Sequence, residues 1–115
     1  MNGVTIIIDL AEAMDRLSVL ILKSTHGKDV AKQVETLIIA IKKSIGINKY
    51  NKVITSNEYG DLARCNRELW MTMGRATKDE GLGGAIDQLN QSRFLCKQKL
   101  QEKFAKKKLE EVKIR

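Results

Sequence analysis

Apolar residues recur along this chain at intervals of three or four positions, the spacing of an α-helix that buries one face. The first such stretch covers residues 9–24. Asp9 begins it and Glu12 follows three positions later, which is the spacing of an N-terminal capping box. The apolar stripe consists of Leu10, Met14, Leu17 and Ile21. This pattern predicts a helix over 9–24 that is terminated by Gly27.

Three further stretches follow the same spacing. One covers 29–45 and stops at Gly46. The next starts near Ser56 and ends before the glycine-rich stretch 81–84. The last begins near Gly84 and is expected to reach as far as Val112. Residues 47–56 lie between the second and third stretches; they are rich in Asn and Lys, and we expect them to form a loop.

The composition agrees with a helical fold. The 115 residues include no proline and 4% aromatic residues, so the core is expected to be aliphatic and helix-breaking positions are few. We therefore predict an all-α fold, a bundle of three or four helices with a long, basic C-terminal helix. Residues 1–104 are expected to form the helical bundle domain, and 105–115 a basic helical extension or a frayed tail.

The net charge of +7 is concentrated near the C-terminus. Residues 97–115 contain eight basic and three acidic residues. Such a segment can bind nucleic acid through phosphates, and no helix-turn-helix or zinc-finger pattern accompanies it. The charge therefore favours non-specific binding of nucleic acid, phosphorylated ligands or an acidic protein over sequence-specific recognition.

The two cysteines and the N-terminal residues indicate the cellular compartment in which the protein is expected. Cys65 and Cys96 are isolated from each other in sequence and belong to helical segments, so reduced thiols are expected. The apolar run 4–8 is too short to cross a bilayer. We expect a cytoplasmic protein without membrane association, in the host cytoplasm if the chain is phage-encoded.

Polar side chains interrupt the apolar pattern at three places where aliphatic residues would suit a core. The first helix carries Glu12, Asp15, Arg16 and Lys23. The third carries Asn66, Arg67, Trp70 and Arg75. The fourth carries Asn90, Arg93 and Lys97 on one face.

These three groups resemble the motifs of an uncharacterised family of small bacterial and phage helical proteins. The family pattern reads E-x-x-D-[KR]-L-[ST]-[IV]-L-x-x-K, then N-x-x-L-W, then N-x-x-R-x-x-x-K. The similar segments here are 12–23, 66–70 and 90–97, in the same order. The chain departs from the family after the tryptophan, where an acidic pair and an arginine are usual and Met73 and Gly74 stand here.

If the three groups converge, they suit a planar ligand that carries phosphate or carboxylate, because arginine binds such oxygens in pairs and tryptophan offers a stacking surface. We therefore predict non-enzymatic binding of a small anionic or nucleotide-like ligand. The predicted pocket residues are Arg16, Lys23, Asn66, Arg67, Trp70, Arg75, Asn90, Arg93 and Lys97. The competing interpretation is that Glu12–Arg16 and Asp15 with an arginine of the last helix are structural ion pairs.

Catalysis has less support in the sequence. Glu12 and Asp15 are the candidate metal ligands, and a metal-dependent nucleotide hydrolase would use Mg²⁺ there. Helical pyrophosphatases use two carboxylate pairs, and the second pair is missing here. The single histidine, His26, lies in a turn and is expected to cap the first helix. No cofactor is expected outside the hydrolase alternative.

The remaining alternative is a protein or non-specific nucleic-acid interaction module that uses the basic C-terminal helix. A homo-oligomer is expected, with the second or the fourth helix at the interface. In a phage protein, the hypothesis becomes sequestration of a ligand or inhibition of a host protein.

Overall fold

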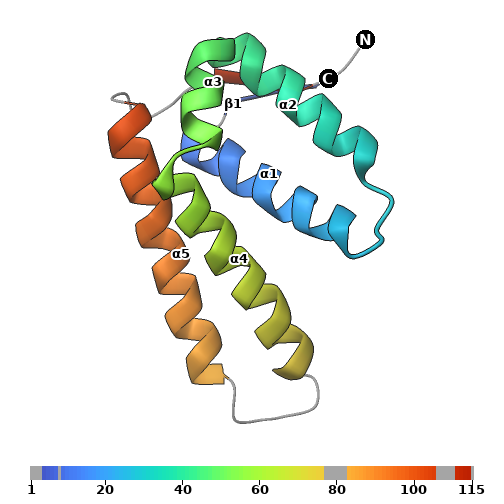
Figure 1. Cartoon of the computed structure of the whole chain (residues 1–115), viewed down its shortest axis with the longest axis vertical. Coiled ribbons are helices and arrows are strands. Elements are labelled where there is room, and N and C mark those ends of the chain that lie inside the picture. Colours follow the sequence, from blue (N-terminus) through green and yellow to red (C-terminus); the bar gives the residue numbers. More distant parts are fainter. Residues whose placement is uncertain (1–3, 8, 77–82, 106–110, 115) are drawn as a thin grey trace.

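Five helices dominate the part of the chain that the structure describes (Figure 1). The computed structural model describes residues 4–7, 9–76, 83–105 and 111–114. The elements in chain order are β1 (Val4–Ile7), α1 (Leu10–Thr25), α2 (Ala31–Ile45), α3 (Ile47–Ile54), α4 (Asn57–Ala76), α5 (Gly83–Phe104) and β2 (Glu111–Ile114). The predicted helical class is confirmed, and α3 is a helix that the sequence did not predict.

The helix ends follow the local signals in the sequence. The Asp9 side chain accepts a hydrogen bond of 2.6 Å from the backbone N–H of Glu12, which caps the start of α1. At the other end, the backbone N–H of His26 donates to carbonyls of the last turn of α1. Gly46 ends α2 and starts α3 with φ +89° and ψ 156°, a conformation that essentially only glycine adopts. The predicted caps at Asp9 and His26 are confirmed.

The longer helices form two antiparallel pairs, α1 with α2 and α4 with α5, and the first pair contacts the second through α1. Helices α4 and α5 lie side by side along the long axis of the molecule, and α1 packs against both of them (Figure 1). Helix α2 returns antiparallel to α1, and the short α3 connects α2 to α4 (Figure 1). Helix α1 therefore contacts α2, α4 and α5, and it lies between the two halves of the fold.

The core is aliphatic, as the composition predicts. Helix α1 contributes Leu10, Met14 and Leu17, all fully buried. Buried residues from every other helix complete this cluster, among them Ile41, Val53, Leu62 and Leu100. Removing these apolar side chains from water is the main favourable term for such a domain.

The prediction of a loop over 47–56 is wrong. Residues 47–54 form α3, which buries Tyr50 and Val53 on one side. Two buried positions three residues apart are enough for a helix that packs on a core, but they are too few to establish a helical period in the sequence.

The predicted extension of the last helix toward Val112 is also wrong. Helix α5 ends at Phe104, and Glu111–Ile114 form β2. This strand pairs with β1 in antiparallel register, Val4 opposite Ile114 and Ile7 opposite Glu111. Two strands of four residues from opposite ends of the chain give no local signal of their pairing, which brings 4–7 beside 111–114. The part of the predicted extension over 106–110 lies outside the described residues.

Candidate functional site

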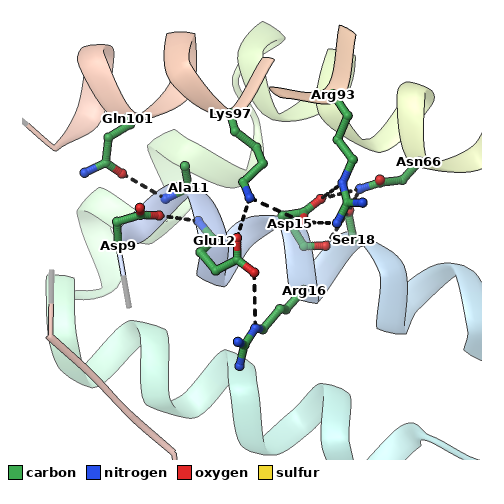
Figure 2. A network of polar contacts seen from close by, with 10 residues as sticks. All are labelled: Asp9, Ala11, Glu12, Asp15, Arg16, Ser18, Asn66, Arg93, Lys97 and Gln101. Carbon is green, nitrogen blue, oxygen red and sulfur yellow. Dashed lines mark hydrogen bonds and ion pairs between the residues drawn. The ribbon is translucent and has the colours of Figure 1, made fainter. Parts of the chain in front are cut away.

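Polar side chains from three helices meet where α1 crosses the α4–α5 pair (Figure 2). We call this group the Asp15 cluster; it consists of Glu12, Asp15, Arg16, Ser18, Asn66, Arg93 and Lys97. Of the three polar groups predicted from the sequence, Glu12, Asp15 and Arg16 of α1 and Arg93 and Lys97 of α5 thus come together, along with Asn66 of the α4 group.

Asp15 lies at the centre of the cluster, and 1% of its surface is exposed. Asn66 donates to one carboxylate oxygen of Asp15 at 2.8 Å, and the Nε of Arg93 donates to the same oxygen at 3.0 Å. A terminal nitrogen of Arg93 donates to the other oxygen. This two-point contact is the planar pairing that arginine makes with carboxylates. The hydrogen bonds from Arg93 to Asp15, together with the negative charges of Asp15 and Glu12, raise the pKa of Arg93 above its ordinary value.

Glu12 links the cluster to solvent. Lys97 donates to one of its carboxylate oxygens, and Arg16 lies 3.5 Å from the other. The ammonium of Lys97 is also 4.0 Å from Asp15, so it bridges both carboxylates. The side chains of Arg16, Arg93 and Lys97 are 44%, 35% and 26% exposed, respectively. The carboxylate of Asp15 is thus enclosed, while its cations reach the surface.

Two residues that sequence reasoning missed complete the junction. Ser18 accepts a hydrogen bond of 2.6 Å from Asn66, and its hydroxyl donates to the backbone carbonyl of Asp15 at 2.9 Å. Gln101 accepts the backbone N–H of Ala11 at 3.0 Å, which satisfies an otherwise free donor at the start of α1. Gln101 lies one helical turn beyond Lys97 on the same face, so an extension of the predicted stripe would have found it.

The cations of the cluster keep hydrogen-bond donors that their contacts with Glu12 and Asp15 do not use. Each carboxylate oxygen of Glu12 and Asp15 already faces a cation or an amide. An arginine has five N–H donors and a lysine three, so the three cations hold more donors than these contacts use. Three cations against two carboxylates also leave one positive charge in excess. The cluster is therefore suited chemically to accept an anion.

The other predicted pocket residues lie elsewhere. Trp70 packs against His26 at the end of α1, with ring centroids 5.3 Å apart. The Nδ1 of His26 lies 2.9 Å from the carbonyl of Leu22, so His26 acts as a helix cap. Asn90 lines a shallow depression on the outer face of α5, together with Gln91, Phe94 and Leu95.

Three more predicted pocket residues lie outside the cluster. Lys23 is half-buried in the last turn of α1, and Arg67 is exposed on α4. The side chain of Arg75 lies outside the described residues. The predicted pocket therefore does not form as one site: Arg16, Asn66, Arg93 and Lys97 converge, whereas Trp70 and Asn90 belong to two other surfaces.

The ion pairs of Glu12 and Asp15 disfavour the metal site that was predicted at these two residues. Glu12 and Asp15 would have to exchange Lys97 and Arg93 for Mg²⁺, because both carboxylates are already neutralised by these cations. Over the residues that the structure describes, no three His, Cys, Asp or Glu side chains are grouped so as to hold a metal ion. In the same part of the chain, no helix combines the length and the apolarity that a membrane span requires.

Comparisons with known proteins add no identity: no family model, no curated protein and no solved structure matches this chain. The resemblance to the bacterial and phage family stays a prediction. The chemistry of the Asp15 cluster is therefore the basis for the functional argument.

Proposed function

We propose that this domain binds a small anion, such as a phosphate or a nucleotide-like monophosphate, at the exposed side of the Asp15 cluster, without turning it over. The observation that carries the proposal is the surplus of cationic donors, partly exposed, around two carboxylates that already contact cations. A phosphate oxygen is an acceptor, so it complements what the cluster has left to offer.

The cations of the cluster have different parts in this proposal. Arg93 is tied to the buried Asp15 through two hydrogen bonds, so it holds the helices together and can offer only its remaining N–H groups. Arg16 is the most exposed of the three, and its contact with Glu12 is long at 3.5 Å. An exposed pair of this kind contributes little to stability. Arg16 is therefore the residue whose removal separates binding from folding.

The test is calorimetric titration of inorganic phosphate and of adenosine monophosphate into wild-type protein and into Arg16→Gln at low ionic strength. A charge-assisted hydrogen bond contributes about 1.5–3 kcal/mol, so Arg16→Gln is expected to weaken binding by about tenfold or more. Thermal unfolding of the variant is expected to match wild type.

Arg64→Gln is the matched control. Arg64 is also an exposed arginine in a short-range helical ion pair, 3.2 Å from Asp61, but it belongs to α4 outside the cluster. This control is expected to bind phosphate as wild type does. Equal affinities of the two variants, or the absence of phosphate binding to wild type, would contradict the proposal.

A second candidate function, non-specific binding of nucleic acid, is favoured on a surface other than the predicted one. On α5, Lys97 and Lys103 are engaged by Glu12 and Glu58. Residues 28–52 contain six lysines and two acidic residues. In the described part of the chain, Lys32 and Lys43 have no acidic partner, and their spacing places them on the same exposed side of α2. Helix α2 thus carries unpaired positive charge that can face phosphates.

Salt-dependent binding of a single-stranded oligonucleotide tests this candidate. The double variant Lys32→Gln/Lys43→Gln is expected to flatten the slope of log affinity against log salt by about 1.4, since each phosphate contact to a single strand contributes about 0.7. The double variant Lys99→Gln/Lys103→Gln on α5 is expected to change the slope less. If the α5 double variant changed the slope more than the α2 double variant, the nucleic-acid-binding surface would lie on the C-terminal helix instead.

A further inference from the structure

Helices α4 and α5 bring the two cysteines of the chain together. The sulfur atoms of Cys65 and Cys96 are 3.9 Å apart, although the residues are separated by 31 positions in sequence. Both thiols are free, and both side chains are partly exposed to solvent. Neither takes part in the Asp15 cluster, so the pair is a separate chemical feature of the α4–α5 contact.

The position of the pair matters for the neighbouring residues. Cys65 precedes Asn66, and Cys96 precedes Lys97, so each thiol is adjacent in sequence to a member of the Asp15 cluster. Cys96 packs against the aliphatic cluster, and this burial, with the neighbouring Cys65, raises the pKa of the Cys96 thiol to about 11. A raised pKa lowers the fraction of thiolate, the nucleophilic form, at neutral pH, so Cys96 reacts slowly.

We propose that Cys65 and Cys96 are an oxidative modification site, at which a small-molecule disulfide such as oxidised glutathione converts the two thiols into a reversible bond between α4 and α5. A disulfide has a sulfur–sulfur length of about 2.05 Å, so the two atoms must approach by about 2 Å, which side-chain rotation and a small helix adjustment can provide. This inference does not depend on the proposed anion binding.

The reaction balances as two exchanges. The thiolate of one cysteine attacks glutathione disulfide, which forms a mixed disulfide and releases one glutathione thiolate. The thiolate of the second cysteine then attacks the protein sulfur of the mixed disulfide and releases the second glutathione thiolate. The two protons lost by the cysteines pass to the two released thiolates. The protein is oxidised by two electrons, and the small disulfide is reduced.

The bond has a structural consequence. It joins α4 to α5 beside the residues that donate to Asp15, so it fixes the separation of the two helices at that level. It also restricts the unfolded chain by closing the loop between residues 65 and 96. The oxidised protein is therefore expected to unfold at a higher temperature than the reduced protein.

The test incubates the full chain with a glutathione redox buffer and follows free thiols and intact mass. Wild type is expected to lose both thiols and the mass of two hydrogen atoms, without retaining glutathione. Cys65→Ser and Cys96→Ser, as matched controls, are expected to stop at a single glutathione adduct. Retention of both thiols, a stable glutathione adduct on wild type, or cross-linked dimers as the main product would overturn the proposal.

A second measurement separates a preformed pair from chance pairing in a flexible chain. The equilibrium constant for oxidation is compared between folded protein and protein in denaturant. Since a bond that stabilises the fold is itself stabilised by the fold, the folded protein is expected to show a constant about tenfold or more above the denatured protein. A ratio of one or below would show that the native geometry does not favour the bond.

Discussion

Helix α1 buries two sets of residues that pack in different ways. Leu10, Met14 and Leu17, its aliphatic side, lie within the aliphatic cluster. Asp15 and Ser18, its polar side, are also buried, and their contacts with α4 and α5 are hydrogen bonds and ion pairs (Figure 2). The aliphatic side gains from burial of apolar surface, which is insensitive to orientation. The polar side requires specific partners at specific positions.

The two sides therefore contribute differently to the stability of the fold and to the arrangement of the helices. A buried ion pair offsets its own desolvation cost only when its geometry is good, so its net contribution to stability is small. Removing one partner is nevertheless costly, because the other is left charged and buried. The polar side of α1 therefore defines how α1 meets α4 and α5, while the aliphatic side supplies most of the free energy of folding.

The largest expected effect comes from breaking the polar side. Asp15→Ala leaves the buried amide of Asn66 and the partly exposed guanidinium of Arg93 without their acceptor, and it is expected to lower the free energy of unfolding by about 2–4 kcal/mol. Chemical denaturation followed by the fluorescence of Trp70, the single tryptophan, measures this. The double variant Asp15→Ala/Arg93→Ala is expected to be less destabilised than the sum of the single variants. Additive losses would mean that the two side chains do not act as a pair.

A substitution at Gly46 tests how much the packing of the aliphatic core depends on the turn between α2 and α3. Gly46→Ala introduces a side chain at φ +89°, where an L-residue is strained, and is expected to lower the free energy of unfolding by about 1–3 kcal/mol. The turn at Gly46 connects α2 to α3, and both helices contribute to the core. Gly60→Ala is the control: a Cβ there meets no atom within 4 Å, and alanine should stabilise α4 by about 0.5–1 kcal/mol. A stabilising effect at Gly46 would contradict the role of this turn.

Alkaline pH is expected to lower the free energy of unfolding through Tyr59, which packs against the aliphatic core. Burial raises the pKa of Tyr59 to about 12 from its ordinary value of 10.0. The folded state therefore keeps the phenol proton over a range where the unfolded chain releases it, so stability is full below pH 10 and falls as the pH approaches 12. The loss is about 1–2 kcal/mol after allowance for the exposed part of the ring.

Tyr59→Phe isolates this contribution, because the variant lacks the phenol hydroxyl and keeps the rest of the side chain. The variant is expected to lose less stability than wild type between pH 10 and pH 12 in parallel denaturant titrations. Identical pH profiles of the two proteins would show that Tyr59 does not titrate differently in the folded state.

The sequence predicted the elements that carry a local signal. The cap at Asp9, the stop at Gly46 and the stripe through Leu10, Met14 and Leu17 depend on neighbouring residues, and each appears in the structure. Helix α3 was missed because its buried face has two positions. The pairing of β1 with β2 was missed because it joins opposite ends of the chain.

The candidate site was predicted in part for the same reason. Helical spacing places Arg93 and Lys97 on one face, and Glu12 and Asp15 on another, before any helix position is known. Spacing alone does not say which faces meet, and so Trp70 and Asn90 were assigned to the same pocket as Arg93. The pairing of Asn66 with Asp15 and Ser18 depends on how α1 crosses α4, which is decided by packing.

The central claim is that Asp15 and Arg93 serve the fold while Arg16 serves the ligand. Nuclear magnetic resonance of the side-chain N–H groups of arginine, during titration with inorganic phosphate, tests this claim most directly. The signal of Arg16 is expected to shift saturably, the Nε signal of Arg93 to shift little, and that of Arg64 not to shift. Equal, unsaturable shifts of all arginines, or no shift at Arg16, would contradict the account.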